Sequence, residues 1–328
     1  MKEKSDFKII NFGGVFIDWI YYIDSFPEQN SKKKANDFII NYGGPAFLAS
    51  NVIGKLSQSF LKKNYLNRKI NSVFISFISD NDFNKIDQIL KSNFVKNESF
   101  ILKENEFNTP RSTILIEGDS RTIIWYNKNL KFSKDKLWRK IENLNIKKEN
   151  TIFLFDGQFM DYAIFISEKL KKLGIKSLID AGSVKENEEK LIKNVSFFIG
   201  SEDYFFQKTG IRNPTEKEGK EFIVEFKNIY NNLEFIGFSF GERDFLGFDF
   251  KENRFLKITP PKVKVIDTTG AGDFLHGAFL FFLVYFNFDI KKAIYRAIKL
   301  ASISCEFEGS TLNLDKIINK FLKEFKNE

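Results

Sequence analysis

Cysteine and histidine are almost absent from this 328-residue sequence, which contains one of each. A lone cysteine, Cys305, excludes a disulfide within the chain, so we expect a reducing compartment. We interpret Cys305 as a small buried helix residue, because no second histidine is available to activate its thiolate. A lone histidine, His276, cannot form a histidine-based metal cluster. It lies one helical turn after Asp273, and we interpret it as a neutral packing residue.

Long apolar runs and the common nucleotide-binding glycine motifs are absent too. No stretch reaches the length of a membrane span, and the N-terminus, MKEKSDFKII, passes from charges into a strand-like run rather than a signal peptide. We therefore expect a cytoplasmic protein without a membrane partner. The sequence has no P-loop, and its GAGDFLHG stretch lacks the third glycine of the G-x-G-x-x-G fingerprint, which disfavours dinucleotide oxidoreductase chemistry.

The charge balance is basic but dispersed. The chain has 51 Lys and Arg against 43 Asp and Glu, a formal net charge of +8, and the longest pure basic run is Lys32 to Lys34. Because no basic stripe forms, we expect no nucleic-acid partner and a solvated surface that attracts anionic substrates. With 43% hydrophobic residues, the chain can bury a sizeable core.

Strand and helix patterns alternate along most of the sequence. This rhythm predicts an α/β fold with a mostly parallel sheet covered on both faces. We expect strands at 7–12, 72–78, 151–155, 176–179, 197–199 and 234–239, and helices at 45–56, 82–90, 161–173, 217–229, 273–287, 289–306 and 314–325. Such sheets bind ligands at the carboxyl ends of their strands, and the residues expected there are Gly13, Asp156, Asp180, Ser201, Gly241 and Asp267.

The stretch from Val263 to Phe279 combines a turn and a helix start that suit an anion. We expect a strand over 263–266, a tight turn at Gly270-Ala271-Gly272 and a helix from Asp273. The small residues let the backbone approach a ligand, and free amide groups converge at the positive end of the helix dipole. Asp273 can accept a hydroxyl proton while the amides stabilise a migrating phosphoryl group. A turn of this kind can also be only a helix cap.

Two segments break the alternating rhythm. Residues 15–22 and 35–42 look like paired strands, and 111–126 is a hairpin around Glu117-Gly118-Asp119-Ser120. We expect these segments, about 15–42 and 110–127, to form a small β-sheet lid over the site, within a single domain spanning 1–328. A lid excludes water, which competes for the phosphoryl group. Its exposed strand edges suggest a homodimer formed through the lid.

The complete string Asp267-Thr268-Thr269-Gly270-Ala271-Gly272-Asp273 matches the second signature of the ribokinase/PfkB family of sugar kinases. The chain resembles this family over nearly its whole length. The resemblance implies a doubly wound α/β fold with a small β-sheet lid, ATP and Mg²⁺ as cofactors, and Asp273 as the catalytic base beside an anion hole at Gly270, Ala271 and Gly272. It leaves the need for a monovalent cation (K⁺) open. The other residues expected at the site are Asp18, Gly43, Gly44, Lys32 and Arg111 for the sugar, Ser201, Ser239, Gly241, Glu242 and Thr268 for the nucleotide, and Glu202 for the metal.

Within the family, three stretches look most like the ketohexokinase-like and sulfofructose kinase branch: DWIYYIDSFPEQ, TPRSTILIEGDSRTIIWY and the Gly-Gly-Pro-Ala helix opening. This favours ATP-dependent phosphorylation of a ketohexose, fructose-like or related sugar. Trp125 and Gln158 stand where a sulfosugar kinase is expected to have an asparagine and an arginine, so an ordinary hydroxylated substrate is favoured over a sulfonated one.

Two further departures keep other functions open. Leu48 stands where many members have an asparagine that binds a sugar hydroxyl, and Tyr204 replaces the glutamate of a motif that helps order magnesium. They motivate a non-catalytic sugar- or nucleotide-binding relative as one alternative. A nucleoside kinase of the same fold is another, because Tyr42, Trp19 and Trp125 offer an aromatic floor for a base.

Overall fold

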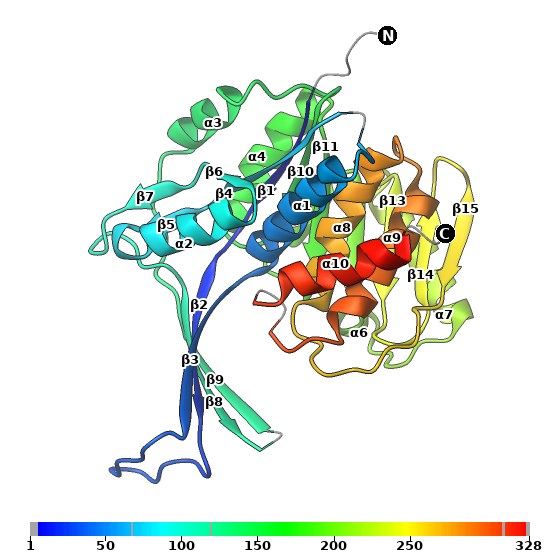
Figure 1. Ribbon diagram of the computed structural model, residues 1–328. Coiled ribbons are helices and arrows are strands. Elements are labelled where there is room, and N and C mark those ends of the chain that lie inside the picture. The colour runs from blue at the N-terminus through cyan, green and yellow to red at the C-terminus, as the bar shows by residue number, and fades with distance from the viewer. Residues whose placement is uncertain (1–5, 67, 119, 310–311, 326–328) are drawn as a thin grey trace.

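A nine-stranded sheet forms the centre of the computed structural model, which describes residues 6–66, 68–118, 120–309 and 312–325 (Figure 1). The strand order is β15-β14-β13-β12-β11-β10-β1-β4-β6, and all neighbours are parallel except β13-β14 and β14-β15. The strands are β1 (Phe7–Phe12), β4 (Ile70–Ile75), β6 (Val95–Asn97), β10 (Thr151–Phe155), β11 (Lys176–Ala181), β12 (Phe197–Ser201), β13 (Phe235–Ser239), β14 (Phe245–Asp249) and β15 (Arg254–Ile258). The expected mostly parallel, doubly wound α/β fold is confirmed.

Helices cover both faces of this sheet, because successive apolar strand residues point to opposite sides. In β1, Ile9 packs into one hydrophobic cluster and Ile10 into the other. The first cluster contains residues of α1 (Pro45–Lys62), α2 (Asp80–Ser92), α8 (Ala271–Tyr285), α9 (Ile290–Ser304) and α10 (Leu314–Phe325). The second contains residues of α3 (Lys134–Glu142), α4 (Met160–Lys172), α5 (Glu188–Ile192), α6 (Glu202–Thr209) and α7 (Glu216–Ile229).

Helix α8 is buried over most of its length, from Phe274 to Val284. It lies close to α1, since a Cβ atom at Gly277 would be 2.8 Å from the Ala49 carbonyl oxygen. This packing fixes the direction of α8, so that its first turn is held at the carboxyl ends of the strands. Although α8 is strongly apolar, no helix in the described ranges is both long and apolar enough to cross a membrane.

A second, four-stranded sheet extends away from this body (Figure 1). We call it the small sheet; its order is β3-β2-β8-β9, with β2 (Phe16–Tyr22), β3 (Asp37–Gly43), β8 (Arg111–Glu117) and β9 (Ser120–Tyr126). Its outer strand β9 is exposed at every position. A short parallel pair, β5 (Phe77–Ser79) and β7 (Phe100–Leu102), lies beside the body. The four strands of the small sheet fall in the two segments in which the sequence predicts a lid.

The strand predicted over 263–266 does not form, so that prediction is wrong. This segment is irregular, and Val265 and Ile266 are more than half exposed. It is held instead by amide groups of Ile266 and Asp267, which both donate to the carbonyl oxygen of Cys305. The preceding Pro260 and Pro261 lack amide protons, which disfavours a ladder with the neighbouring edge of the sheet. A β-branched apolar run is therefore present without a partner strand.

Candidate active site

The order of the large sheet points to a candidate ligand site between β1 and β10. The strand order reverses here, because the chain from β1 continues to β4 on one side while β10 is followed by β11 on the other. Open α/β sheets bind ligands at such a switch point, beyond the carboxyl ends of the strands, and we call this region of the loops after β1 and β10 the crevice. Gly13 and Gly14 follow β1, and Asp156 follows β10.

Asp156 is buried at this point and organises the loops around it. Its carboxylate accepts hydrogen bonds from the amides of Gly14 (2.9 Å), Ala46 (3.3 Å) and Gln158 (2.8 Å). A side chain at position 13 is excluded, since a Cβ atom on Gly13 would lie 2.2 Å from this carboxylate. Burial raises the pKa of Asp156 to about 6, although the same amides oppose the shift. Asp156 thereby joins the end of β1 to the start of α1.

Lys185 adds a positive charge beside this acid. Its ammonium group donates to the backbone carbonyl of Asp156 at 2.6 Å and lowers the pKa of the Asp156 carboxyl, against the effect of burial. The sequence places Asp156 and Asp180 at the strand ends but assigns them no role, and it does not single out Lys185. The pattern that could have identified the two aspartates is an acidic residue directly after an apolar strand: TIFLF is followed by Asp156, and SLI is followed by Asp180.

The first turn of α8 forms an uncapped helix N-terminus at the same edge. Gly270 precedes it with a left-handed φ of 82°, and no side chain caps the helix. The amide of Ala271 donates to Thr268, and the first intrahelical bond runs from Phe274 to the Gly270 carbonyl. The amides of Gly272 and Asp273 precede that bond and have no partner one turn back in the helix. This arrangement can bind an anion.

Asp273 is half-buried on this turn and lies near two other carboxyl groups. Burial, followed by the negative charges of Asp180 and Asp156, raises the pKa of Asp273 well above its usual value of 3.8. A carboxylate with a raised pKa is a stronger proton acceptor once it is ionised. The geometry therefore brings together a carboxyl group of raised pKa and a turn that can bind an anion.

The turn before α8 is held in shape by Asp267. Its two carboxylate oxygens accept from the amides of Thr269 (2.8 Å) and Gly309 (3.0 Å). Burial tends to raise the pKa of Asp267, but these hydrogen bonds lower it overall. Asp267 is thus occupied in fixing the turn, and Thr268 is exposed beside it.

Asp18, the acid expected to bind the sugar, is half-buried on β2 of the small sheet. It lies between its cross-strand neighbours Asn41 and Ser112. Burial raises the pKa of Asp18, while hydrogen bonds from those two side chains lower it. Its carboxylate is therefore held in a defined place at the base of the small sheet.

The two glycines expected at the sugar, Gly43 and Gly44, connect the small sheet to α1. Gly44 has a left-handed φ of 114°, and a Cβ atom on it would lie 2.7 Å from the carbonyl oxygen of Gly14. A side chain is therefore excluded at position 44 by both the backbone conformation and the space. This close approach brings the end of the small sheet to the loop after β1, so the two glycines join the sheet to the crevice.

Arg111 and Lys32 are the other two residues expected at the sugar. Arg111, at the start of β8, contacts Asp82 of α2 at 3.1 Å and Glu104 at 3.9 Å, so its positive charge is already paired. Lys32 is exposed in the connection between β2 and β3. Figure 1 shows this connection at the end of the small sheet that is far from the body. The structure therefore does not bring Lys32 to the crevice.

The residues expected at the nucleotide follow β12 and β13. Ser201 ends β12 and caps α6, accepting from the amide of Tyr204 and donating to Gly182. Ser239 ends β13, and its hydroxyl contacts the Gly200 carbonyl at 3.5 Å. Gly241, with a φ of 64°, and Glu242 are exposed just beyond. The adjacent strand ends thus place Ser201 and Ser239 side by side.

Glu202, the expected metal ligand, is paired with Arg243 at 2.5 Å. Tyr204, which replaces the usual glutamate, is fully buried, and its hydroxyl donates to Glu188 at 3.0 Å. Leu48, at the other departure from the family pattern, is buried in the core of the body. No group of three or more His, Cys, Asp or Glu within the described ranges could hold a metal ion alone. Magnesium bound mainly through nucleotide phosphates fits these residues better than a protein cage.

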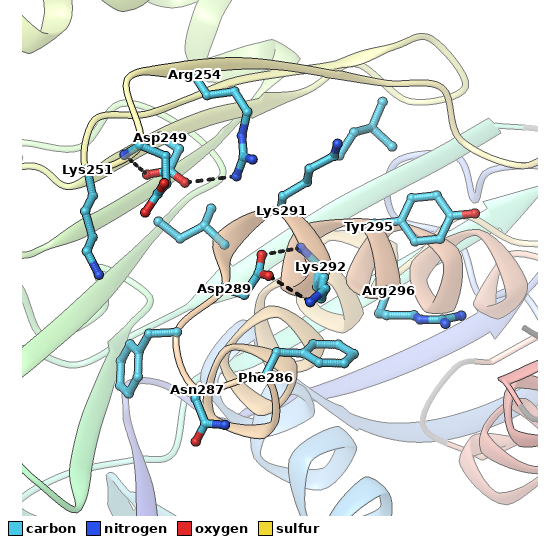
Figure 2. Close-up of a pocket in the computed structure, with 14 residues that line it drawn as sticks. Asp249, Lys251, Arg254, Phe286, Asn287, Asp289, Lys291, Lys292, Tyr295 and Arg296 are labelled. Carbon is cyan, nitrogen blue, oxygen red and sulfur yellow. Dashed lines mark hydrogen bonds and ion pairs between the residues drawn. The ribbon is translucent and has the colours of Figure 1, made fainter.

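A separate hollow of about 810 Å³ lies between the β14–β15 turn and the start of α9 (Figure 2). It lies at the amino ends of the parallel strands, whereas Asp273 lies at their carboxyl ends. Asp249, the last residue of antiparallel β14, shows this because it pairs with the first residue of β13. Two ion pairs join charged residues of its lining, Arg254 with Asp249 (3.4 Å) and Lys292 with Asp289 (3.2 Å). This hollow takes no part in the crevice described above.

Comparison with known proteins agrees with this geometry. The model of the pfkB family carbohydrate kinases matches residues 6–317. The chain belongs to the PfkB family of carbohydrate kinases. Its members are sugar kinases, so the expected enzyme class is confirmed, whereas the match does not distinguish the ketohexokinase-like branch.

Two relatives and one solved structure illustrate the similarity of this PfkB kinase. A ribokinase of Dictyostelium discoideum is 25% identical, with 91% of this chain and 94% of that protein covered. A ribokinase of Lactococcus lactis subsp. lactis (strain IL1403) is 26% identical, with 75% and 80% covered. The structure of Arabidopsis thaliana ribokinase complexed with ribose and ATP superimposes with a TM-score of 0.76 at 17% identity, covering 97% and 99% of the two chains.

Proposed function

We propose that this PfkB kinase transfers the γ-phosphoryl group of ATP to a hydroxyl group of a neutral sugar, with Asp273 as general base. One observation carries the proposal: the half-buried Asp273 carboxylate lies on the uncapped first turn of α8, where free amides meet the positive end of the helix dipole. The base and the anion hole thus come from the same helical turn.

The proposed chemistry follows from the charges on this turn. The sugar hydroxyl gives its proton to the Asp273 carboxylate as its oxygen attacks the γ-phosphorus, and the bond to the ADP oxygen breaks. Amides of Gly272 and Asp273 stabilise the transferring phosphoryl oxygens. Because Asp273 must be ionised to accept the proton and its pKa is raised, turnover falls as the pH drops through that raised pKa.

A neutral substrate is favoured by the charges around the crevice. Asp18, Asp156, Asp180 and Asp273 are acidic, whereas Arg111 is held by Asp82 at 3.1 Å. These four carboxyl groups would repel an anionic sugar, and Lys185, the cation beside Asp156, offsets only part of their charge. We propose ribose first, because two relatives are ribokinases, and fructose-like ketohexoses second, because of the sequence stretches on the small sheet. A panel of free sugars and nucleosides, followed by ADP release, separates these from a nucleoside kinase.

For the nucleotide, we propose that ATP lies along the ends of β12 and β13 toward the first turn of α8. Ser201, Ser239, Gly241, Glu242 and Thr268 line that course. Magnesium supplies charge neutralisation of the phosphates when bound, and Glu202 reaches it only if its contact with Arg243 opens. Assays with Mg²⁺, and with K⁺ or Na⁺ as the monovalent ion, test both cation requirements.

We further propose that the small sheet closes over the sugar and that two chains pair through it. Asp18 at its base then contacts a sugar hydroxyl, and the far end of the sheet, which carries Lys32, approaches the partner chain. The support is its exposed outer strand: Ile124, Trp125 and Tyr126 of β9 are all more than half exposed. An unpaired apolar edge of this kind favours association.

Replacement of Asp273 by Asn tests the proposed base. Asn keeps the shape of the side chain but accepts no proton, so kcat is expected to fall by about 10²-fold or more, the range that general bases supply. ADP formation is measured with ribose and with fructose, and ATP binding by calorimetry shows that the nucleotide still binds. Asp289→Asn is the matched control, since Asp289 also starts a helix but lies at the opposite edge. Near-wild-type turnover of the Asp273 variant refutes the assignment.

A further inference from the structure

His276 is a buried polar residue directly below the proposed active-site turn. It is 5% exposed, and each of its ring nitrogens contacts an oxygen atom. Nδ1 lies 2.6 Å from the Gly272 carbonyl and 3.1 Å from the Asp180 carboxylate. Nε2 lies 3.2 Å from the carbonyl of Ile199 in β12. The sequence indicated a packing residue; the structure gives the ring a complete set of polar partners.

The chemistry of these partners decides the state of the ring. The Gly272 and Ile199 carbonyls can only accept hydrogen bonds, and so can an ionised Asp180. A neutral imidazole has one N–H group, so one of its nitrogens would direct a lone pair at an oxygen. An imidazolium has two N–H groups and satisfies both sides of the ring.

We propose that His276 is an imidazolium whose ion pair with Asp180 positions the first turn of α8 and offsets the negative charge beside the catalytic base. Through Gly272, the ring holds the carbonyl of an anion-hole residue; through Ile199 and Asp180, it anchors that carbonyl to β12 and β11. His276 acts through these neighbours and touches no substrate, so it is a positioning residue.

The charged groups around the ring explain why its charge matters. Asp180 faces it from β11, Asp273 is one turn earlier on its own helix, and Asp156 follows β10. Lys185 is the cation placed beside Asp156. The negative charges of Asp180 and Asp156 raise the pKa of Asp273. A positive charge on His276 reduces this rise, because it offsets the negative charge of Asp180.

The ring can be observed directly, because His276 is the only histidine in the chain. Full-length protein carrying ¹⁵N-histidine and no histidine tag gives one imidazole signal. At neutral pH, where a free imidazole is mostly uncharged, both ring nitrogens are expected to carry a proton. In Asp180→Asn, the proton on one nitrogen is expected to be lost. A ring nitrogen without a proton in the wild type overturns the proposal, and this readout needs no activity.

Kinetics test the effect on the base, and this part rests on the proposed function. His276→Asn keeps a donor near the Nδ1 position but removes the charge, so the pKa of Asp273 is expected to rise further. The acid limb of the profile of kcat against pH, where kcat falls as the pH is lowered, is then expected to lie about one pH unit higher. In Asp180→Asn the carboxylate and the ring charge are lost together, so its acid limb is expected to stay close to that of the wild type, whereas an uncharged ring would let it move down. The double variant, with Asn at both positions, carries neither charge of the pair. Its acid limb is therefore expected to lie close to that of the wild type.

The outcomes separate this inference from the general-base assignment. If Asp273→Asn is inactive while the acid limb of His276→Asn stays where it is in the wild type, the charge on the ring has no effect on the base and this inference fails alone. If Asp273→Asn keeps its turnover, the assigned base is wrong, and the NMR signal still decides the state of the ring. Should His276→Asn fold poorly, as judged by circular dichroism, the Asp180 variant carries the test.

Discussion

Replacing Gly272 by Ala separates the anion hole from the stability of the fold. Gly272 lies exposed in the first turn of α8, its φ is not left-handed, and a Cβ atom there would have no other atom within 4 Å. Alanine favours a helix over glycine by up to about 1 kcal/mol. The variant is therefore expected to unfold at the same or a slightly higher denaturant concentration than the wild type.

Turnover is expected to respond in the opposite direction. The empty space beside Gly272 is where the proposal places the transferring phosphoryl group, so the new methyl group meets the ligand rather than the protein. An extra methyl group in a closely packed site costs about 1–3 kcal/mol. If this cost falls on the transition state, it corresponds to a loss of about 5- to 150-fold in kcat/KM for ATP.

The assay pairs ADP release with urea unfolding, and Gly277→Ala is the contrasting variant. Gly277 is on the same helix, but its Cβ would lie 2.8 Å from the Ala49 carbonyl oxygen, so this variant is expected to lose stability by about 1–3 kcal/mol. Gly272→Ala is expected to lose turnover while its stability is unchanged. Gly277→Ala is expected to lose stability before it loses turnover. A Gly272 variant with wild-type turnover means that no anion lies at this turn and refutes the reasoning.

Two other variants test the remaining features. Asp156 has a folded pKa of about 6 against an ordinary 3.8, so the folded state holds more protons between these values and stability falls as the pH rises through this window. Relative to Asp156→Asn, the wild type is expected to lose up to roughly 3 kcal/mol between about pH 4 and pH 7 in urea unfolding, and parallel curves contradict this. Ile124→Lys puts a charge on the exposed outer strand of the small sheet and is expected to shift sedimentation from dimer to monomer; a wild-type sedimentation profile argues against pairing through β9.

Local patterns in the sequence were sufficient for most elements of the fold. The strand at 7–12, the strand at 151–155 and the helix at 314–325 have the predicted bounds, since each is set by an apolar run with clear punctuation. The strand over 263–266 was wrong because strand formation depends on a neighbour, which no local pattern specifies. Its exposed valine and isoleucine show an apolar run without a sheet to join.

The site was predictable where its parts are consecutive in the chain. The turn from Asp267 to Asp273 is one string, so its composition indicates the anion hole and the base together. Asp156 could not be given a role, because its hydrogen-bond partner Gly14 is 142 residues away in sequence. The contact between His276 and Ile199, 77 residues apart, was hidden for the same reason. Single residues at strand ends acquire a function only through their neighbours in space.

Crowding three carboxyl groups at one edge of the sheet opposes folding and assists the chemistry. Asp156, Asp180 and Asp273 repel one another when ionised, and burial raises the pKa of Asp156 and Asp273. An isolated aspartate would be ionised at neutral pH but would be a weak base for a sugar hydroxyl. The same repulsion that destabilises this edge therefore strengthens Asp273 as a proton acceptor. Lys185 and, in our inference, His276 limit the repulsion, so that Asp273 remains ionised at the pH where the enzyme works.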